Sequence, residues 1–231
     1  MEKGPDPLKA LVDRLQAGGA IRSAETARAF LAVPRHAFLP TSARAVAYDD
    51  EAVNVKYDGD GHIISSASQP TMMAEMLEQL RPQAGNRVLE IGTGTGYNAA
   101  LLSELVGESG LVVSVEVDAE LAVVARSCLS DTGYGRVEVV VGDGQDGWTI
   151  RSPYDCVIVT AGVATVVVAW RDQLRDGGRL VVPLVDDHGV GFATVFEKRA
   201  KALIKVAEQP CRFLALRSAT PDPQPTREEI R

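Results

Sequence analysis

A glycine-rich loop between a predicted strand and a predicted helix constrains the fold more than any other feature of this 231-residue chain. Residues 87–91 form an apolar strand pattern, residues 97–106 form a helical pattern, and Gly92, Gly94 and Gly96 lie between them. Glycines let the backbone turn sharply and approach a ligand closely, and the N-terminus of the following helix offers free N–H donors. The loop therefore predicts a nucleotide-like ligand at the carboxyl end of the strand.

Downstream of the loop the chain alternates between strand and helix patterns. Strands are predicted over residues 111–117, 137–141, 154–160 and 179–184, and helices over residues 119–129 and 166–174. Strands separated by helices of about ten residues indicate right-handed βαβ units and a parallel sheet. We expect a doubly wound, Rossmann-like α/β fold.

The two ends of the chain add elements outside this alternation. Helices are predicted over residues 8–15 and 23–33, and a third begins at Ser68-Gln69-Pro70, since proline is favoured in a first helical turn. A closing antiparallel hairpin (192–197 and 203–206) and a last strand (211–217) are expected near the C-terminus. The expected divisions are an N-terminal helical, substrate-side region (1–80), a core (81–217) and a flexible tail (218–231). Whether residues 49–68 form a mobile lid is left open.

Composition excludes several classes of function. The net charge of −7, from 24 Lys and Arg against 31 Asp and Glu, disfavours a nucleic-acid surface. No apolar run reaches the roughly 18 residues needed to cross a bilayer. Three separated cysteines suggest no disulfide framework, and three scattered histidines show no metal-ligand spacing, so no metal is expected. These features predict a cytoplasmic protein with reduced thiols and no membrane partner; the oligomeric state is left open.

Two details separate the glycine loop from that of dinucleotide-binding proteins, which read G-x-G-x-x-G. Here the pattern is G-x-G-x-G, Tyr97 stands where the third glycine would fall, and Glu90 precedes the first glycine by two residues. This combination resembles class I methyltransferases that use S-adenosyl-L-methionine (SAM). SAM has no pyrophosphate, and its cationic groups favour a nearby acid. Glu90 could alternatively only orient the loop backbone.

Two further acids lie at the ends of the next two strands. Glu116 ends the strand at residues 111–117, where a carboxylate can accept both ribose hydroxyls, and Asp143 follows the strand at residues 137–141, where it can accept the adenine amino group. The expected cofactor-binding residues are Glu90, Gly92, Thr93, Gly94, Gly96, Tyr97, Glu116, Val117, Asp143 and Gly144.

Outside the nucleotide half, the sequence resembles the protein-L-isoaspartate O-methyltransferase family. The resemblance is carried by FLAVPRHAFLP (30–40), Ser-Gln-Pro (68–70), VVVGDG (139–144) and GGRLVVP (177–183), and it extends over residues 8–217. It implies methylation of the side-chain carboxylate of isoaspartate in damaged proteins, after which the ester closes to a succinimide.

That chemistry agrees with the absence of an obvious catalytic triad. A carboxylate with a pKa of about 4 is already ionised at pH 7 and needs no general base, so catalysis rests on positioning, with helix N-terminal N–H groups and a hydroxyl as donors. By resemblance Ser68 supplies the hydroxyl and Ser66 could share the role; alternatively Ser68 is a plain N-cap. Arg35 and His36 are candidate carboxylate partners, or else structural or surface residues.

Three segments depart from the family pattern: residues 58–70, 162–168 and 213–216. By analogy all three lie near the acceptor, which slightly favours relatives that methylate aspartate in ribosomally made peptides such as lanthipeptides and graspetides, where the ester closes to an aspartimide. The classical isoaspartate repair enzyme is the first alternative. A SAM-binding partner protein without activity is an alternative of another class.

Overall fold

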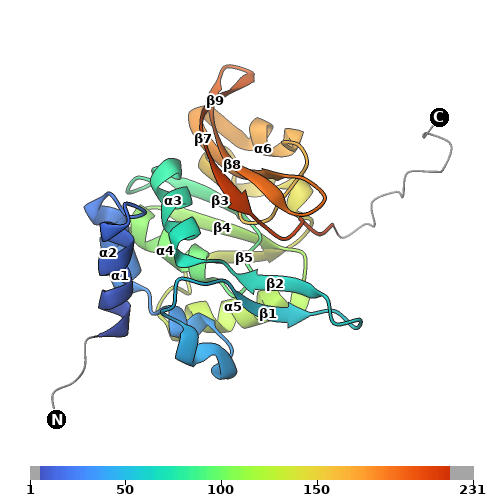
Figure 1. The fold of residues 1–231 in the computed structure, drawn as a ribbon. Helices are drawn as coiled ribbons and strands as arrows, with labels where there is room; N and C mark the ends of the chain where they lie inside the picture. The colour runs from blue at the N-terminus through green and yellow to red at the C-terminus, as the bar shows by residue number, and fades with distance from the viewer. Residues whose placement is uncertain (1–5, 219–231) are drawn as a thin grey trace, which may run out of the picture.

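A seven-stranded sheet forms the centre of the computed structural model, which describes residues 6–218 (Figure 1). Its strand order is β5-β4-β3-β6-β7-β8-β9; β5 to β7 are parallel in this order, and β8 and β9 pair antiparallel. The predicted α/β class is confirmed. Apart from Ser218, the predicted tail lies outside the described residues. The strands are β3 Arg87–Ile91, β4 Leu111–Glu116, β5 Glu138–Val141, β6 Tyr154–Val159, β7 Leu174–Val185, β8 Val190–Arg199 and β9 Ala202–Arg212.

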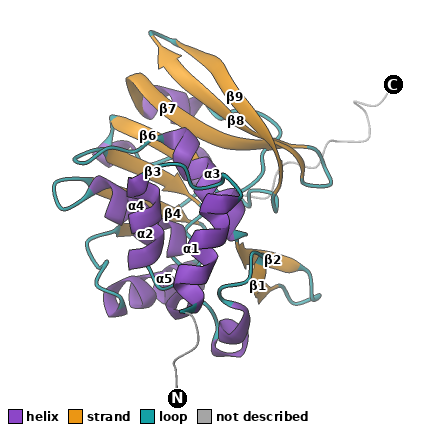
Figure 2. Cartoon of the chain, turned by 60° about the vertical axis from the view of Figure 1, so that its left-hand side comes forward, coloured by secondary structure: helices purple, strands orange, loops and turns teal. Residues whose placement is uncertain are grey.

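Helices cover the two faces of the sheet unequally (Figure 2). The helices on one face are α1 Pro7–Ala17, α2 Ala24–Ala32, α3 Pro70–Leu80, α4 Tyr97–Val106 and α5 Ala119–Asp131, whereas α6 Val168–Gln173 packs on the other. Strand side chains alternate between the two faces. Ile158 of β6 therefore joins the core with Met76 and Leu101, and its neighbour Val157 packs in the core of Trp170. The N-terminal helices thus share one core with the sheet.

The strand order of the sheet reverses at β3. From β3 the chain steps outward through β4 to β5, and it then returns to the opposite side of β3 to form β6 and β7. Loops at the carboxyl ends of β3 and β6 diverge at this point, which is where open α/β sheets bind their ligands.

The N-terminal region holds an element that the sequence did not predict as such. β1 Val53–Tyr57 and β2 Ile63–Ala67 form a separate two-stranded antiparallel sheet, with Val53 opposite Ala67 and a turn between the strands. The five-residue β2 was missed because only two of its residues are large and apolar.

The predicted last strand over residues 211–217 is wrong. Cys211 and Arg212 complete β9, and the following residues leave the sheet. Gly162 N donates to Leu214 O at 2.7 Å, and Leu216 N donates to Gly162 O at 2.8 Å. Because residues 214–216 pair with Gly162, which follows β6, residues 213–218 cross the end of β6 and do not extend the edge of the sheet.

Two boundaries near β7 differ from the prediction for local reasons. The helix α6 begins only at Val168, since the preceding valine run favours extended backbone. The strand predicted over residues 179–184 begins earlier, as β7 at Leu174, because Asp176-Gly177-Gly178 forms a bulge within it: Tyr154 pairs with Leu174 and Cys156 pairs with Arg179. Gly177 supplies the positive φ of 73° that the bulge requires.

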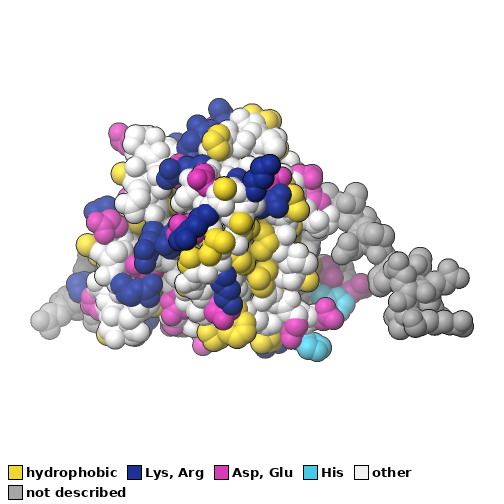
Figure 3. All heavy atoms as spheres, turned by 90° about the horizontal axis from the view of Figure 1, so that it is seen from above, with side chains coloured by type: hydrophobic (Ala, Val, Ile, Leu, Met, Phe, Trp, Pro, Cys, Tyr) yellow, Lys and Arg dark blue, Asp and Glu magenta, His cyan; other side chains and the backbone are white. Residues whose placement is uncertain are grey.

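The outer end of the sheet presents a mixed surface. Seen from above, apolar side chains gather there among Lys and Arg side chains (Figure 3). Val190 and Phe192 of β8 and Ile204 and Val206 of β9 are exposed. Among residues 6–218, no helix is both long and apolar enough to cross a bilayer.

A carboxylate on α3 attaches the start of α2 to the core helices. Glu78 Oε1 accepts hydrogen bonds from Arg22 N at 3.0 Å, Ser23 N at 2.8 Å and Ser23 Oγ at 2.7 Å. Ser23 is the N-cap of α2, and its Oγ also accepts from Thr26 N. The Glu78 carboxylate therefore binds both the backbone before α2 and the residue that caps it.

We expect Glu78→Ala to lower the free energy of unfolding by about 1–3 kcal/mol, since it leaves several donors without their acceptor. Glu78→Gln keeps one acceptor oxygen and should cost less. Urea unfolding of the two variants measures the difference, and an alanine variant as stable as the wild type would contradict this role.

Candidate functional site

A cavity of 520 Å³ lies at the point where the chain reverses across the sheet. Its walls come from the glycine loop after β3, from β2 and the start of α3, and from residues 212–217. Nine predicted site residues line it: Ser66, Ser68, Gly92, Thr93, Gly94, Tyr97, Glu116, Val117 and Gly144. Two of the three segments that depart from the family pattern, residues 58–70 and 213–216, contribute to this wall through residues 64–69 and 213–216. The third, residues 162–168, does not line the cavity, although the preceding Thr160 and Ala161 do.

The glycine loop turns where side chains have no room. Gly92 has a φ of 96°, and a Cβ there would lie 2.6 Å from Thr160 Oγ1 on the neighbouring β6 loop. Gly96 has a φ of 92°, and a Cβ there would lie 3.1 Å from Leu129 Cγ of α5. The predicted sharp turn is confirmed. Gly96 packs on α5 and does not line the cavity.

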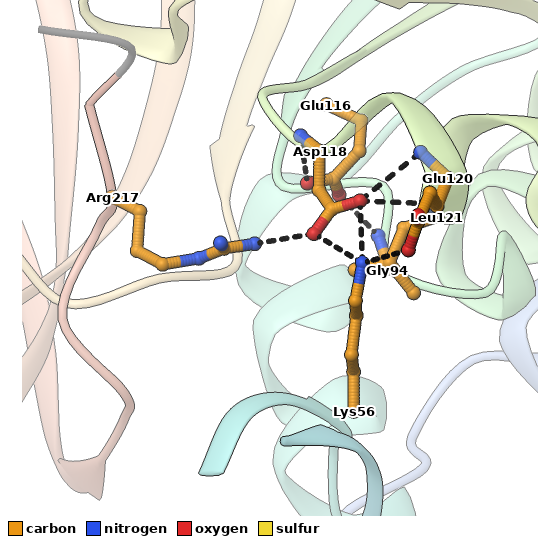
Figure 4. Close-up of polar contacts among 7 residues, drawn as sticks. All are labelled: Lys56, Gly94, Glu116, Asp118, Glu120, Leu121 and Arg217. Carbon is orange, nitrogen blue, oxygen red and sulfur yellow. Dashed lines mark hydrogen bonds and ion pairs between the residues drawn. The ribbon is translucent and has the colours of Figure 1, made fainter. Parts of the chain in front are cut away.

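Glu116 points from the end of β4 toward the glycine loop (Figure 4). Its Oε2 accepts from Gly94 N at 2.9 Å, and its Oε1 accepts from Asp118 N at 3.1 Å. The side chain is only 5% exposed and lines the cavity. The carboxylate is therefore fixed by two backbone donors at the position where a ligand hydroxyl or cation would meet it.

Glu90 lies beneath the loop and does not line the cavity. It is fully buried and accepts hydrogen bonds from Asn98 Nδ2 at 2.8 Å and from Ser114 Oγ, which also contacts Thr93 Oγ1 at 2.6 Å. Burial raises its pKa to about 7, although these donors oppose the shift. Glu90 thus connects the loop to α4 and β4, and it reaches cavity-lining residues directly through Asn98 and by way of Ser114 through Thr93.

The raised pKa of Glu90 gives a stability prediction with a definite sign. The folded state keeps this proton up to about pH 7, whereas an unperturbed carboxyl loses it near 4.5, so the folded protein loses stability as the pH rises through that window. Glu90→Gln does not titrate. Its free energy of unfolding relative to wild type should therefore increase by roughly 1–3 kcal/mol between pH 5 and pH 8. Urea unfolding at several pH values tests this, and a pH-independent difference would refute it.

Asp143 does not line the cavity. Its Oδ1 accepts from Gln145 N at 2.9 Å, and its Oδ2 accepts from Ser218 Oγ. Residues 216–218 therefore lie beside the β5 loop, and a Cβ on Gly144 would lie 3.5 Å from Leu216 Cδ1. The carboxyl-terminal segment, which sequence reasoning treated as a strand, forms this wall instead.

On the acceptor side, the N-cap reading of Ser68 is wrong. The N-cap of α3 is Gln69, and the N–H of Thr71 is bound by Asp50 Oδ1 at 2.8 Å. The expected free donor at this helix terminus is thus already occupied. Within residues 6–218, Ser68 Oγ has no hydrogen-bond partner, and Ser68 lines the cavity together with Ser66.

Arg35 and His36 are not carboxylate partners in this cavity. Arg35 is fully buried and donates to backbone carbonyls, and His36 is exposed with its Nδ1 2.6 Å from Tyr48 Oη. Neither lines the cavity. Tyr97, which replaces the third glycine of the dinucleotide pattern, does line the cavity. Its ring also packs against Phe30 and Phe38, so this residue connects the glycine loop to the N-terminal helical region.

Sequence reasoning missed a group of charges beside the cavity, of which Arg217 lines it (Figure 4). Asp118, the N-cap of α5, is paired with Lys56 of β1 at 2.7 Å and with Arg217 at 3.4 Å. Burial would raise the pKa of Asp118, but the bonds from Lys56 and the helix N–H groups outweigh it and lower the pKa. No local pattern could reveal this group, since its members lie up to 161 residues apart.

The hairpin tip also departs from expectation. Asp58, Asp60 and His62 bring potential metal-ligand atoms within 4.8 Å of one another, although the histidines had shown no ligand spacing in sequence. All three are exposed, and Asp58 Oδ1 accepts from the backbone N–H of Asp60 and His62. A turn closed by Asp58 explains the grouping.

Asp118→Asn should loosen both elements that Asp118 holds, because asparagine keeps the N-cap but removes the charge. If loss of these ion pairs lowers the free energy of local opening by about 1 kcal/mol, amide hydrogen exchange in residues 53–67 and 213–217 should become roughly fivefold faster. Asp13→Asn, which removes the exposed Lys9–Asp13 pair, is the matched control. Unchanged exchange in both segments would show that the ion pairs do not hold them.

The sequence of this chain is similar to those of known proteins. The family model for protein-L-isoaspartate(D-aspartate) O-methyltransferase matches residues 7–220. A protein-L-isoaspartate O-methyltransferase of Methanopyrus kandleri is 46% identical over 179 residues, covering 77% of this chain and 76% of that protein. One of Hyperthermus butylicus is 38% identical over 214 residues, covering 89% and 86%.

Solved structures give the same result. A protein-L-isoaspartate O-methyltransferase superposes with a TM-score of 0.82 at 37% identity, covering 92% of this chain and 66% of that one. A protein described as a putative member from Plasmodium falciparum, in complex with S-adenosyl-L-homocysteine, superposes with a TM-score of 0.76 at 17% identity. At that identity the second likeness concerns the fold alone.

Proposed function

We propose, from the premise that this chain belongs to the protein-L-isoaspartate(D-aspartate) O-methyltransferase family, that it methylates L-isoaspartyl residues of damaged proteins. It is a SAM-dependent carboxyl O-methyltransferase. The observation that carries the proposal is the single cavity that joins the glycine loop and Glu116 to Ser66 and Ser68. One cavity can therefore hold a methyl donor and a carboxylate acceptor in contact.

The residues of the cavity fit SAM. Asn98 Oδ1 is buried and lacks a partner within the described residues, because Asn98 Nδ2 is turned toward Glu90. An orphaned acceptor in the same cavity as the carboxylate of Glu116 suits a ligand with cationic and hydroxyl donors. SAM, when bound, supplies an electrophilic methyl group. Glu116, Asn98 and the loop backbone would hold it, and Glu90 would act through Asn98.

The acceptor needs orientation rather than activation. Its carboxylate is ionised at neutral pH, so no residue has to remove a proton. The Ser68 hydroxyl, which has no partner among residues 6–218, would donate to one carboxylate oxygen and leave the other free to receive the methyl group. The ester formed would then close to a succinimide without further help from these side chains.

The nature of the acceptor is the finer part of the proposal. Relatives at 46% and 38% identity are named for L-isoaspartate, and we therefore place that acceptor first. Aspartate in a constrained ribosomal peptide, which the sequence slightly favoured, is the second candidate. It is supported by the unusual Ser65 and Ser66, which lie on the part of β2 that lines the cavity.

Labelled methyl transfer from SAM to paired peptides tests the function. We expect transfer to a linear L-isoaspartyl peptide and little to its L-aspartyl twin. Transfer mainly to aspartate in a cyclised peptide would favour the second candidate. SAM binding without transfer to any carboxylate would support the partner-protein alternative.

In the same assay, Ser68→Ala should lower kcat/KM about 10- to 100-fold, because a donor to the reacting carboxylate is lost. SAM affinity should not change. Ser66→Ala is the matched control on the same wall, and equal effects of both substitutions would remove the special role of Ser68.

A further inference from the structure

The most unusual charge in the molecule is a buried arginine without a carboxylate partner. Arg35 is fully buried, and within residues 6–218 it forms no ion pair. Its two terminal nitrogens donate instead to backbone carbonyls, most closely to Ala47 at 2.8 Å, Glu51 at 3.0 Å and Ser68 at 3.1 Å. Burial lowers the pKa of Arg35, but a guanidinium keeps its charge in proteins.

These carbonyls belong to two segments that are distant in sequence and adjacent at the cavity. Glu51 precedes β1, Ser68 follows β2, and both line the cavity wall. Weaker contacts of 3.4 Å to Asp49 O and 3.5 Å to Ala67 O extend the same pattern. One side chain therefore sets the orientation of the backbone at both ends of the hairpin.

The orientation has a consequence for the opposite side of each peptide unit. In a planar trans peptide the C=O of one residue and the N–H of the next point in opposite directions. Since the carbonyls of Glu51 and Ser68 point toward Arg35, the N–H groups of Ala52 and Gln69 point away from it. Both residues line the cavity, and neither N–H has an acceptor among the described residues.

We propose that Arg35 is a positioning residue that turns the N–H groups of Ala52 and Gln69 toward the acceptor carboxylate. The inference rests on the proposed function and names the donors that complement Ser68 Oγ. Gln69 is half-buried, where an N–H group needs a partner, whereas Ala52 is exposed and its N–H can also bind water. A carboxylate accepts several such bonds. The guanidinium also contributes a positive charge behind this wall without touching the substrate.

Gln69→Pro tests the donor directly. Gln69 has a φ of −57°, which proline adopts, so the substitution removes the N–H with little change of backbone. Gln69→Ala is the control, because it removes the side-chain contacts to Asp50 but keeps the N–H. We expect the KM for the isoaspartyl peptide to rise about tenfold more in Gln69→Pro than in Gln69→Ala, with SAM affinity equal in both.

Arg35→Lys tests the positioning role. Lysine keeps the charge but lacks the fork that reaches both segments. We expect a folded protein with unchanged SAM affinity and a peptide KM raised several-fold. If Arg35 acts through the Gln69 N–H, the combined Arg35→Lys and Gln69→Pro variant should lose less than the product of the two single effects.

The outcomes are separable. Suppose that the wild type is active. If Gln69→Pro then gives the same KM as Gln69→Ala, or if the effects of Arg35→Lys and Gln69→Pro on KM multiply in the combined variant, the inference is overturned and the function stays intact. A wild type that neither methylates nor binds the isoaspartyl peptide, measured by calorimetry with S-adenosylhomocysteine present, would overturn the function and this inference with it.

Discussion

The crowded turn after β3 is the constraint on which the rest of the site depends. Side chains are excluded at Gly92 by Thr160 and at Gly96 by Leu129, so the ends of β3, β4 and β6 can come together. Beneath this turn, the carboxylate of Glu90 accepts hydrogen bonds from α4 and β4. Burial raises the pKa of Glu90, since two neutral donors only partly compensate a buried charge.

The acceptor half is organised differently, because its segments do not belong to the main sheet. β1, β2 and residues 213–218 lack the continuous ladder that fixes β3 to β7. Besides a few backbone bonds, such as those of Gly162 with Leu214 and Leu216, charged side chains hold them. Arg35 binds backbone carbonyls at the two ends of the hairpin, and Asp118 pairs with Lys56 and Arg217. Such contacts attach the hairpin to the rest of the molecule at a few points, whereas its strands and its turn at Asp58 are held by the hairpin's own hydrogen bonds.

This difference explains what could be read from the sequence. β3 and α4 were predicted at their observed bounds because their patterns are local and a glycine loop separates them. Glu116 was found at the cavity because a strand end fixes its position. Asp143, expected at the ligand, does not line the cavity, and the last strand was wrong; both outcomes depend on where residues 213–218 cross Gly162. The chain carries no local signal for that long-range pairing, just as nothing beside Arg35 in sequence indicates that its partners are carbonyls.

The placement of Arg35 behind the wall also suits the chemistry. A cation in direct contact with the acceptor would stabilise its charge, lower its basicity and weaken it as a nucleophile. The same cation would repel a sulfonium in the adjoining part of the cavity. Backbone N–H groups and a hydroxyl avoid both effects, because they fix the direction of the carboxylate while carrying no net charge. An enzyme that must bring an anion to a cationic methyl donor gains more from donors turned by a distant arginine than from the arginine itself.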